Sequence, residues 1–133
     1  MSNEADYTVK SIDEMERTFG GGLVKARAEL GANSFGMAIE DFPPNFESYP
    51  EHNHEHDSQE EVYIVLEGSG TVTLDGTKYD LDRSTLVRVG PSVKRKFDVG
   101  PEGLRLLALG GVPGAVYSAP QWTELGSPDP TAG

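Results

Sequence analysis

Apolar and polar residues alternate with a period of two over most of the chain after residue 22, as in short β-strands that are buried on one face. The strongest of these segments is 61–67, which is rich in β-branched and aromatic residues. Asp75 and Gly76 form a typical hairpin turn, and glycine or proline separates most of the other segments. The remaining segments with strand character are 7–10, 23–30, 35–40, 71–74, 78–81, 85–89, 94–99 and 104–109. This pattern predicts an all-β sandwich or barrel.

One segment near the N-terminus has a helical pattern instead. Ser11 and Glu14 have the spacing of a capping box, and apolar residues at 12, 15 and 19 would lie on one stripe of a helix. The glycines at 20–22 would end it. The sequence therefore predicts one short N-terminal helix from Ser11 to Phe19.

Composition narrows the functional classes. The chain has 133 residues, a length that suits one domain, and it has no cysteine, which excludes disulfides and thiolate metal sites. The net charge of −11 argues against binding to nucleic acid or to anionic membranes. No apolar run approaches the ~20 residues of a membrane span, and the first residues do not resemble a signal peptide, so we expect a cytoplasmic protein.

The C-terminal region has a different composition from the rest. We expect one domain over residues 1–125, with its core at about 23–112, and a disordered tail over 126–133, where proline, glycine and serine are frequent. Trp122 lies just before this tail. It is predicted to cap the barrel or to contact a partner subunit.

All three histidines of the chain fall within five residues, at His52, His54 and His56. Residues two apart project from the same face of an extended strand, so the three imidazoles would line one surface. Glu61 opens the next strand and could bring a carboxylate to the same place. These groups are ligands for divalent iron, manganese, nickel, copper or zinc, and two histidines with one carboxylate would leave positions for water or substrate. The alternative is a solvated histidine-rich loop.

The spacing His54-x-His56-x₄-Glu61-x₆-Gly68 resembles the first sequence motif of the cupin family, and the resemblance extends from about residue 30 to residue 109. It implies a cupin-type double-stranded β-helix, or jelly-roll barrel, that is often dimeric and holds a metal inside. On spacing we favour His54 and His56 as the paired ligands, with His52 as a substitute or third ligand. His52 and His54 follow proline, as the family's pair often does, but lie further from Glu61 than is usual.

The chain departs from the family at the second cupin motif, which normally supplies a further histidine ligand. Residues 89–95 align with that motif, and Arg95 takes the place of the histidine. Arginine stays cationic and has no lone pair for a metal. Two roles are open for Arg95. It could bind a carboxylate, phosphate or carbonyl group of a ligand inside the barrel, or it could form an ion pair with Glu61.

Two functions follow from this resemblance. The first is a metal-binding cupin that acts on a small organic molecule by isomerisation, oxygenation or decarboxylation. Arg95 and Tyr63 are then the candidate ligand-binding residues, and Tyr63 or Glu67 are candidate acid–base groups, with no catalytic residue identified. The alternative is a non-catalytic module that binds a sugar or another small molecule, which the missing histidine favours. The sequence leaves open whether the protein is an enzyme. We expect a homodimer in either case.

Overall fold

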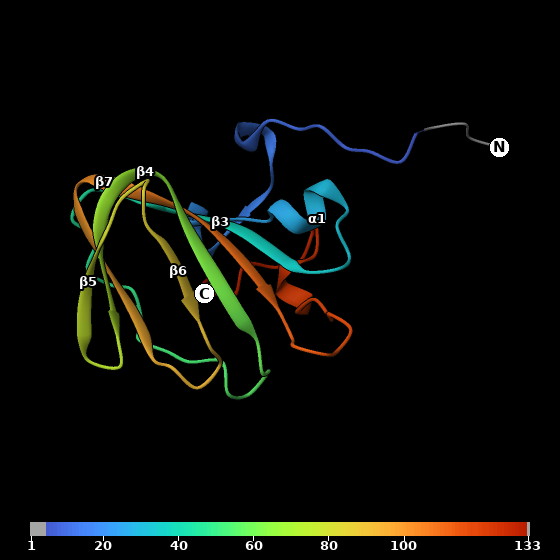
Figure 1. The fold of residues 1–133 in the computed structure, drawn as a ribbon. Helices are drawn as coiled ribbons and strands as arrows, with labels where there is room; N and C mark the ends of the chain where they lie inside the picture. Colours follow the sequence, from blue (N-terminus) through green and yellow to red (C-terminus); the bar gives the residue numbers. More distant parts are fainter. Residues whose placement is uncertain (1–4, 133) are drawn as a thin grey trace.

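In the computed structural model of the protein, which describes residues 5–132, two long antiparallel strands form the centre of the fold, β4 (Glu60–Leu74) and β7 (Arg95–Gly111). They pair along almost their whole length, and register shifts near Val65 and Gly68 bend the pair at its middle. Each strand therefore runs through both layers of a barrel (Figure 1).

Five shorter strands complete the sheet, namely β1 (Arg17–Thr18), β2 (Leu23–Val24), β3 (Gly36–Phe42), β5 (Thr77–Leu81) and β6 (Leu86–Val89). β3 pairs with the second half of β7, and β2 and then β1 continue outward from β3. β5 pairs with the second half of β4, and β6 pairs with its first half. Every pairing is antiparallel, which confirms the predicted all-β barrel.

The predicted helix from Ser11 to Phe19 is wrong. The structure has a single 3₁₀ turn, η1 (Ile12–Glu14), and a second short turn, η2 (Phe19–Gly21), on either side of β1. The Ser11 side chain makes no capping hydrogen bond. β1 pairs with β2 and buries Thr18, so tertiary pairing overrides the local helical pattern.

The predicted strand over 23–30 is also only partly correct. It ends after Val24, and α1 (Ala26–Leu30) follows. Ala26 and Arg27 are neighbours and both are buried. In a strand covered on one face only, neighbouring side chains point to opposite faces, so one of the two would be exposed. No helix among residues 5–132 is long and apolar enough to cross a membrane.

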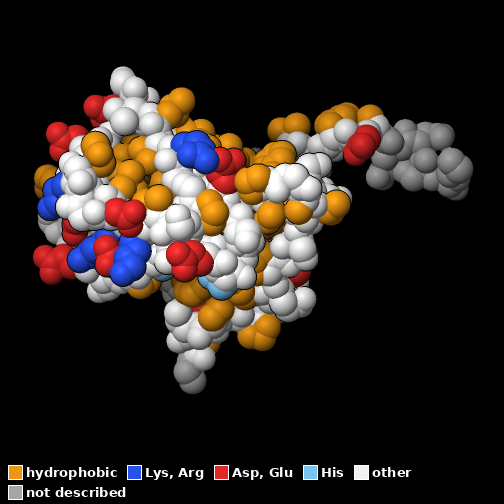
Figure 2. Space-filling model, turned by 60° about the horizontal axis from the view of Figure 1, so that its bottom comes forward, with side chains coloured by type: hydrophobic (Ala, Val, Ile, Leu, Met, Phe, Trp, Pro, Cys, Tyr) orange, Lys and Arg blue, Asp and Glu red, His pale blue; other side chains and the backbone are white. Residues whose placement is uncertain are grey.

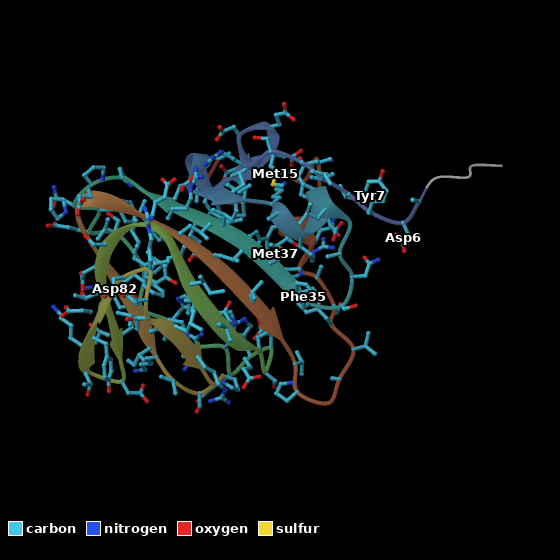
Figure 3. The ribbon with its side chains drawn as sticks, turned by 45° about the horizontal axis from the view of Figure 1, so that its top comes forward. Asp6, Tyr7, Met15, Phe35, Met37 and Asp82 are labelled. Atoms are coloured by element: carbon cyan, nitrogen blue, oxygen red, sulfur yellow. The ribbon has the colours of Figure 1, made fainter. Side chains whose placement is uncertain are left out.

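The N-terminal segment lies outside the barrel. Residues 5–11 extend away from the body of the molecule, and Tyr7 and Val9 are exposed (Figures 1 and 2). The strand predicted at 7–10 therefore has no partner among the residues that the structure describes. Further along the chain, Met15 packs with Val24, Ala26 and Ile39 on the outer face of β3 (Figure 3). Ile39 therefore faces this outer cluster, and its neighbours Ala38 and Glu40 face the barrel interior.

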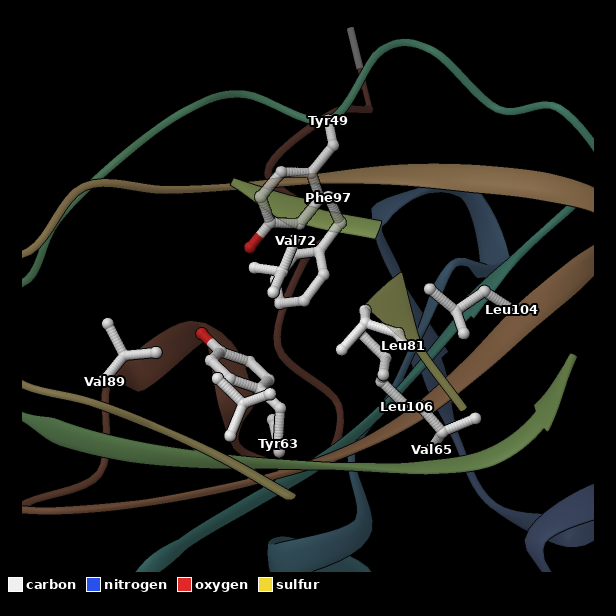
Figure 4. Close-up of a cluster of buried hydrophobic side chains, with 11 residues drawn as sticks. Tyr49, Tyr63, Val65, Val72, Leu81, Val89, Phe97, Leu104 and Leu106 are labelled. Atoms are coloured by element: carbon white, nitrogen blue, oxygen red, sulfur yellow. The ribbon is translucent and has the colours of Figure 1, made fainter. Parts of the chain in front are cut away.

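The barrel interior is the larger of two apolar cores. Aromatic rings form its centre: the ring of Phe97 lies 5.0 Å from that of Tyr49 and 4.9 Å from that of Tyr63, both edge to face (Figure 4). Aliphatic residues from β4, β5, β6 and β7 surround them. The other buried members are Val65, Val72, Leu81, Val87, Val89, Leu104, Leu106 and Ala108.

The C-terminal segment packs back on the N-terminal strands. The Lys25 ammonium group is buried and donates hydrogen bonds to the carbonyl oxygens of Glu124 and Ser127, and the Gly20 amide donates to Asp129. Contacts with the N-terminal strands thus reach residue 129, inside the predicted tail. Disorder of the tail in solution stays a prediction, and Gly133 and residues 1–4 lie outside the described residues.

The bend of β4 depends on Gly68. Its φ is +81°, and a Cβ built there would lie 2.0 Å from the carbonyl oxygen of Gly103, a backbone atom that cannot move aside cheaply. Gly76 has a similar φ of +88°, but a Cβ there meets nothing within 4 Å. Alanine at Gly76 would therefore introduce backbone strain alone, whereas alanine at Gly68 would introduce the same strain together with a steric clash.

We expect Gly76→Ala to lower the free energy of unfolding by about 1–2 kcal/mol, from the left-handed backbone alone. Gly68→Ala is expected to cost about 1–3 kcal/mol more, because the clash adds to the same strain. Urea unfolding of both variants measures the difference. Equal losses would contradict the close approach of the two backbones.

Asp41 joins three strands, β1, β3 and β7, on the outer face of the sheet. Arg105 donates to both of its carboxylate oxygens, at 2.6 and 3.0 Å, and Arg17 donates at 2.9 Å. Burial raises the pKa of Asp41, but the hydrogen bonds from Arg105 and then Arg17 outweigh it, so the pKa lies below its usual value of 3.8. The carboxylate therefore stabilises the fold above its ordinary pKa, and this contribution is lost as the pH falls through the lowered pKa.

We expect Asp41→Asn to lower the free energy of unfolding by about 1–2 kcal/mol at pH 7, a modest value because the pair is partly exposed to solvent. The difference from wild type is expected to shrink steadily below about pH 4. Asp80→Asn, at an exposed position of β5, is the matched control. A constant difference between pH 7 and pH 3 would show that the charge of Asp41 plays no part.

Candidate functional site

A cavity of about 420 Å³ lies in the barrel, between β3, β4, β7, the histidine segment and the C-terminal segment. Histidine atoms reach the surface between acidic and hydrophobic side chains (Figure 2). Trp122, which the sequence suggested as a cap, lines this cavity beside Tyr117 and Pro120, so the C-terminal segment forms one wall. Trp122 is in turn held by an edge-to-face contact with Phe19, at 5.0 Å between ring centroids.

Small residues make the space. On β3, Gly36 and Ala38 pair with Gly110 and Ala108 of β7, and all four line the cavity. Larger side chains at these inward positions would fill the barrel, as Leu104 and Leu106 do further along β7. We call these four residues the cavity floor.

Glu61 and Tyr63 stand two residues apart on β4 and both line the cavity. One oxygen of Glu61, Oε1, is approached by three groups: His54 Nε2 at 3.1 Å, the Tyr63 hydroxyl at 2.5 Å and Arg95 Nη1 at 2.8 Å. Burial raises the pKa of Glu61, but this effect is outweighed by the hydrogen bonds from His54 and Tyr63 and by the charges of His54 and Arg95. The pKa of Glu61 therefore lies below its usual value. Glu61 is therefore ionised at neutral pH.

Arg95 is fully buried at the start of β7. Nη1 donates to Glu61, and Nη2 donates to the carbonyl oxygens of Gly90 and Val93 at 3.1 and 3.0 Å. Its side chain is not part of the cavity wall. Of the two roles that the sequence left open, this geometry supports the ion pair with Glu61. Tyr63 does line the cavity, and burial, followed by the charge of Glu61, raises its pKa well above 10.

His52 has one ring nitrogen engaged by an oxygen acceptor, and His54 has both. His52 Nδ1 lies 3.1 Å from the carbonyl oxygen of Pro50, which can only accept, so Nδ1 carries the proton and Nε2 keeps its lone pair. Burial lowers the pKa of His52, which favours this neutral form. His54 Nδ1 lies 3.1 Å from the Asp57 carboxylate, which orients its Nε2 toward Glu61. The hydrogen bond to Glu61 raises the pKa of His54.

The structure brings His52, His54 and Glu61 together, with one ligand atom of each within 4.8 Å of the others. His56 joins a different group with His54 and Asp57, and its side chain is 73% exposed. Sequence spacing favoured His54 with His56, but the chain turns after His54: its carbonyl accepts the amides of residues 57 and 58. Strict alternation therefore stops at His54. The His56 ring still stacks on that of His54, with 5.7 Å between ring centroids, and lines the cavity, but it shares a ligand group with Asp57 and not with Glu61.

Two cavity carboxyl groups were not predicted from the sequence. Asp57 orients His54, and Glu40 points inward from β3 between Ala38 and Phe42. The pKa of Glu40 is raised to about 7 by burial and then by the charge of Glu61. The signal for Glu40 was present in the sequence as a charged residue at an inward position, but it becomes visible only once the faces of β3 are known.

The sequence and the fold are both similar to those of known proteins. The family model of the cupin domain matches residues 38–110. A cupin protein from Bacteroides fragilis has a similar structure, with a TM-score of 0.66 and 22% sequence identity, and the match covers 90% of this chain and 93% of that one. This likeness concerns the fold.

Two curated proteins match part of the chain. Dimethylsulfoniopropionate lyase DddW of Ruegeria pomeroyi is 33% identical over 77 residues, which is 58% of this chain and 48% of the lyase. An uncharacterized protein of Methanocaldococcus jannaschii is 33% identical over 55 residues, 41% of this chain and 44% of that protein. The chain therefore spans about half the length of the curated relatives it matches.

The burial of Arg95 leads to a prediction about stability. Arg95→Met would leave Glu61 as a buried charge without its cation and would strip two carbonyls of their donor. We expect a loss of about 3–5 kcal/mol in the free energy of unfolding. The double variant Arg95→Met with Glu61→Gln is expected to recover part of it, because no unpaired charge then remains. Arg88→Met is the control, since Arg88 pairs with Glu60 at the exposed surface. A double variant as unstable as the sum of its single variants would contradict the coupling.

Proposed function

The chain belongs to the cupin family, and from this we propose that it binds a divalent transition metal through His52, His54 and Glu61 and acts on a small organic molecule held in the barrel cavity. The observation that carries the proposal is the orientation of the two imidazoles. Each has Nδ1 held by an oxygen acceptor, Nε2 of His54 points at Glu61 Oε1, and a ring nitrogen of His52 lies within 4.8 Å of the ligand atoms of both residues. Metal-binding histidines in proteins are held in this way by outer hydrogen bonds.

The donor set fits a metal with open positions. Two imidazoles and one carboxylate suit iron, manganese, nickel, copper or zinc. His54 Nε2 and Glu61 Oε1 lie 3.1 Å apart, and a metal ion would replace the proton that holds them together. The guanidinium of Arg95 stands beside the same oxygen at 2.8 Å, so we expect weaker metal binding than at a four-ligand site. When bound, the ion would act as a Lewis acid toward an oxygen of the ligand.

The surrounding residues would orient and shield a ligand. Arg95 and Tyr63 fix the Glu61 carboxylate, and Asp57 fixes the ring of His54. Trp122 and Tyr117 cover the cavity from the C-terminal segment and limit the access of water. An isomerase-, oxygenase- or decarboxylase-like reaction on a small molecule is the class of activity that we propose. We also propose a homodimer.

The second candidate is a non-catalytic module that binds a small molecule without metal. The observation in its favour is that Glu61 Oε1 already has three partners, one of them a permanent cation. In this case the Arg95–Glu61 pair has a purely structural role, with Arg95 behind the cavity wall. Metal titration separates the two candidates.

We expect protein purified without a nickel column and treated with a chelator to bind one Mn²⁺, Ni²⁺ or Zn²⁺ per chain in calorimetric titration. Affinity is expected to fall at least about tenfold in His52→Ala and in His54→Ala, since each removes one of three ligands. His56→Ala is the matched control and is expected to bind as wild type does. Loss in His56→Ala with none in His52→Ala would assign the metal to the outer group, and no binding by wild type would favour the metal-free module.

A further inference from the structure

Glu40 is a partly buried carboxyl group that the proposed metal site does not use. It lies on the inward face of β3, next to the cavity floor and on the far side of β7 from Glu61. Neither of its carboxyl oxygens has a hydrogen-bond partner among residues 5–132, and Oε2 is completely buried. A buried carboxyl group without a partner costs free energy, so a group that binds to it would gain from satisfying it.

The cations around the cavity are already committed to acids of this chain. The Lys25 ammonium group is paired with Glu16 at 2.6 Å, and the Arg27 guanidinium is paired with Glu124 at 2.5 Å. Arg95 is paired with Glu61 and lies behind the wall. The charge of each of these three cations is therefore already balanced by an acid of this chain, and of the two that line the cavity only Arg27 keeps a nitrogen, Nε, without a hydrogen-bond partner in the described part of the chain.

We propose that Glu40 selects the ligand of this cavity by accepting a hydrogen bond from a donor group, a hydroxyl or an ammonium, of a small molecule that lies over the cavity floor. The ligand would carry no carboxylate at that end, because a second carboxylate would face the same buried acid without a cation. The four small residues of the floor leave the space in which such a molecule reaches Glu40.

The electrostatics of Glu40 agree with this assignment. Burial and the charge of Glu61 raise the pKa of Glu40 to about 7, so the group exists in both forms near neutral pH. The protonated form can exchange hydrogen bonds with a hydroxyl, and the ionised form would be stabilised by an ammonium group. Substitution of Glu40 distinguishes the two donors.

The test uses three four-carbon probes of matched size: erythritol, which has only hydroxyls, 4-aminobutan-1-ol, which has an ammonium group, and succinate, which has only carboxylates. Calorimetry and thermal unfolding are measured for wild type, Glu40→Gln, Glu40→Leu and the exposed control Glu47→Gln. We expect erythritol or 4-aminobutan-1-ol to bind wild type and the control, and succinate not to bind.

The variants then identify the donor. A hydroxyl ligand is expected to keep its affinity for Glu40→Gln within a few-fold and to lose at least about tenfold in Glu40→Leu. An ammonium ligand is expected to lose that much in both variants, because both remove the charge. Glu40→Leu is expected to unfold at the same temperature as wild type or a higher one, since it removes a buried carboxyl group without a partner. Binding of succinate alone, no binding of either donor probe, or donor binding that survives Glu40→Leu would overturn the proposal.

This inference rests on the proposed function only for the use of the same cavity, and the two can fail separately. The probe titrations are repeated on chelator-treated protein and on His52→Ala, which alters the metal group and leaves Glu40 in place. Donor binding through Glu40 without any metal binding would remove the metal proposal and keep this one. Metal binding, together with probe binding that is unchanged by substitution of Glu40, would remove this proposal and keep the metal proposal.

Discussion

The ion pair between Arg95 and Glu61 joins the start of β7 to the start of β4, and the candidate site is built around it. Arg95 is fully buried, and its second nitrogen holds the loop before β7 through the carbonyls of Gly90 and Val93. Its backbone pairs with that of His52, so the residue that fixes Glu61 also positions a histidine. A buried pair stabilises only when its geometry is good and other hydrogen bonds satisfy its remaining polar atoms. Here both partners have several such bonds, and Nε of Arg95 is the atom left without one among residues 5–132.

The same ion pair sets the chemistry available to the cavity. His54, Arg95 and the Tyr63 hydroxyl hold Glu61 ionised. Its negative charge is therefore largely compensated before any metal ion binds. If it binds the metal that we propose, such a site would bind it weakly and leave positions open, because an arginine cannot serve as a further ligand. Arg95 lies behind the cavity wall and pairs with Glu61, so its charge is not offered to an anionic ligand in the cavity. The carboxyl group of Glu40, which also lines the cavity, has no hydrogen-bond partner among the residues that the structure describes.

Sequence patterns identified the parts of the fold that depend on local chemistry. The strand at 61–67, the Asp75–Gly76 turn and the meeting of histidines with Glu61 were predictable, because alternation, turn residues and spacing encode them. The continuation of that strand through Gly68 to Leu74 was not, because the glycines there are typical of a turn. The helix at 11–19 failed because pairing of β1 with β2 outweighed a weak capping signal. Spacing to Glu61 favoured His56 over His52, and the turn after His54 could not be predicted because no glycine or proline marks it. Glu40 could not be assigned to the site, since its neighbours come from distant strands.

The most direct test of the account is anomalous diffraction from crystals of the wild-type protein grown with Mn²⁺. The account predicts one strong peak per chain at about 2.0–2.2 Å from Nε2 of His52 and His54, with a Glu61 oxygen as third ligand. It also predicts that Arg95 remains buried against Glu61 and the carbonyls of Gly90 and Val93. A peak between His54, His56 and Asp57, or an Arg95 side chain turned into the cavity, would contradict it.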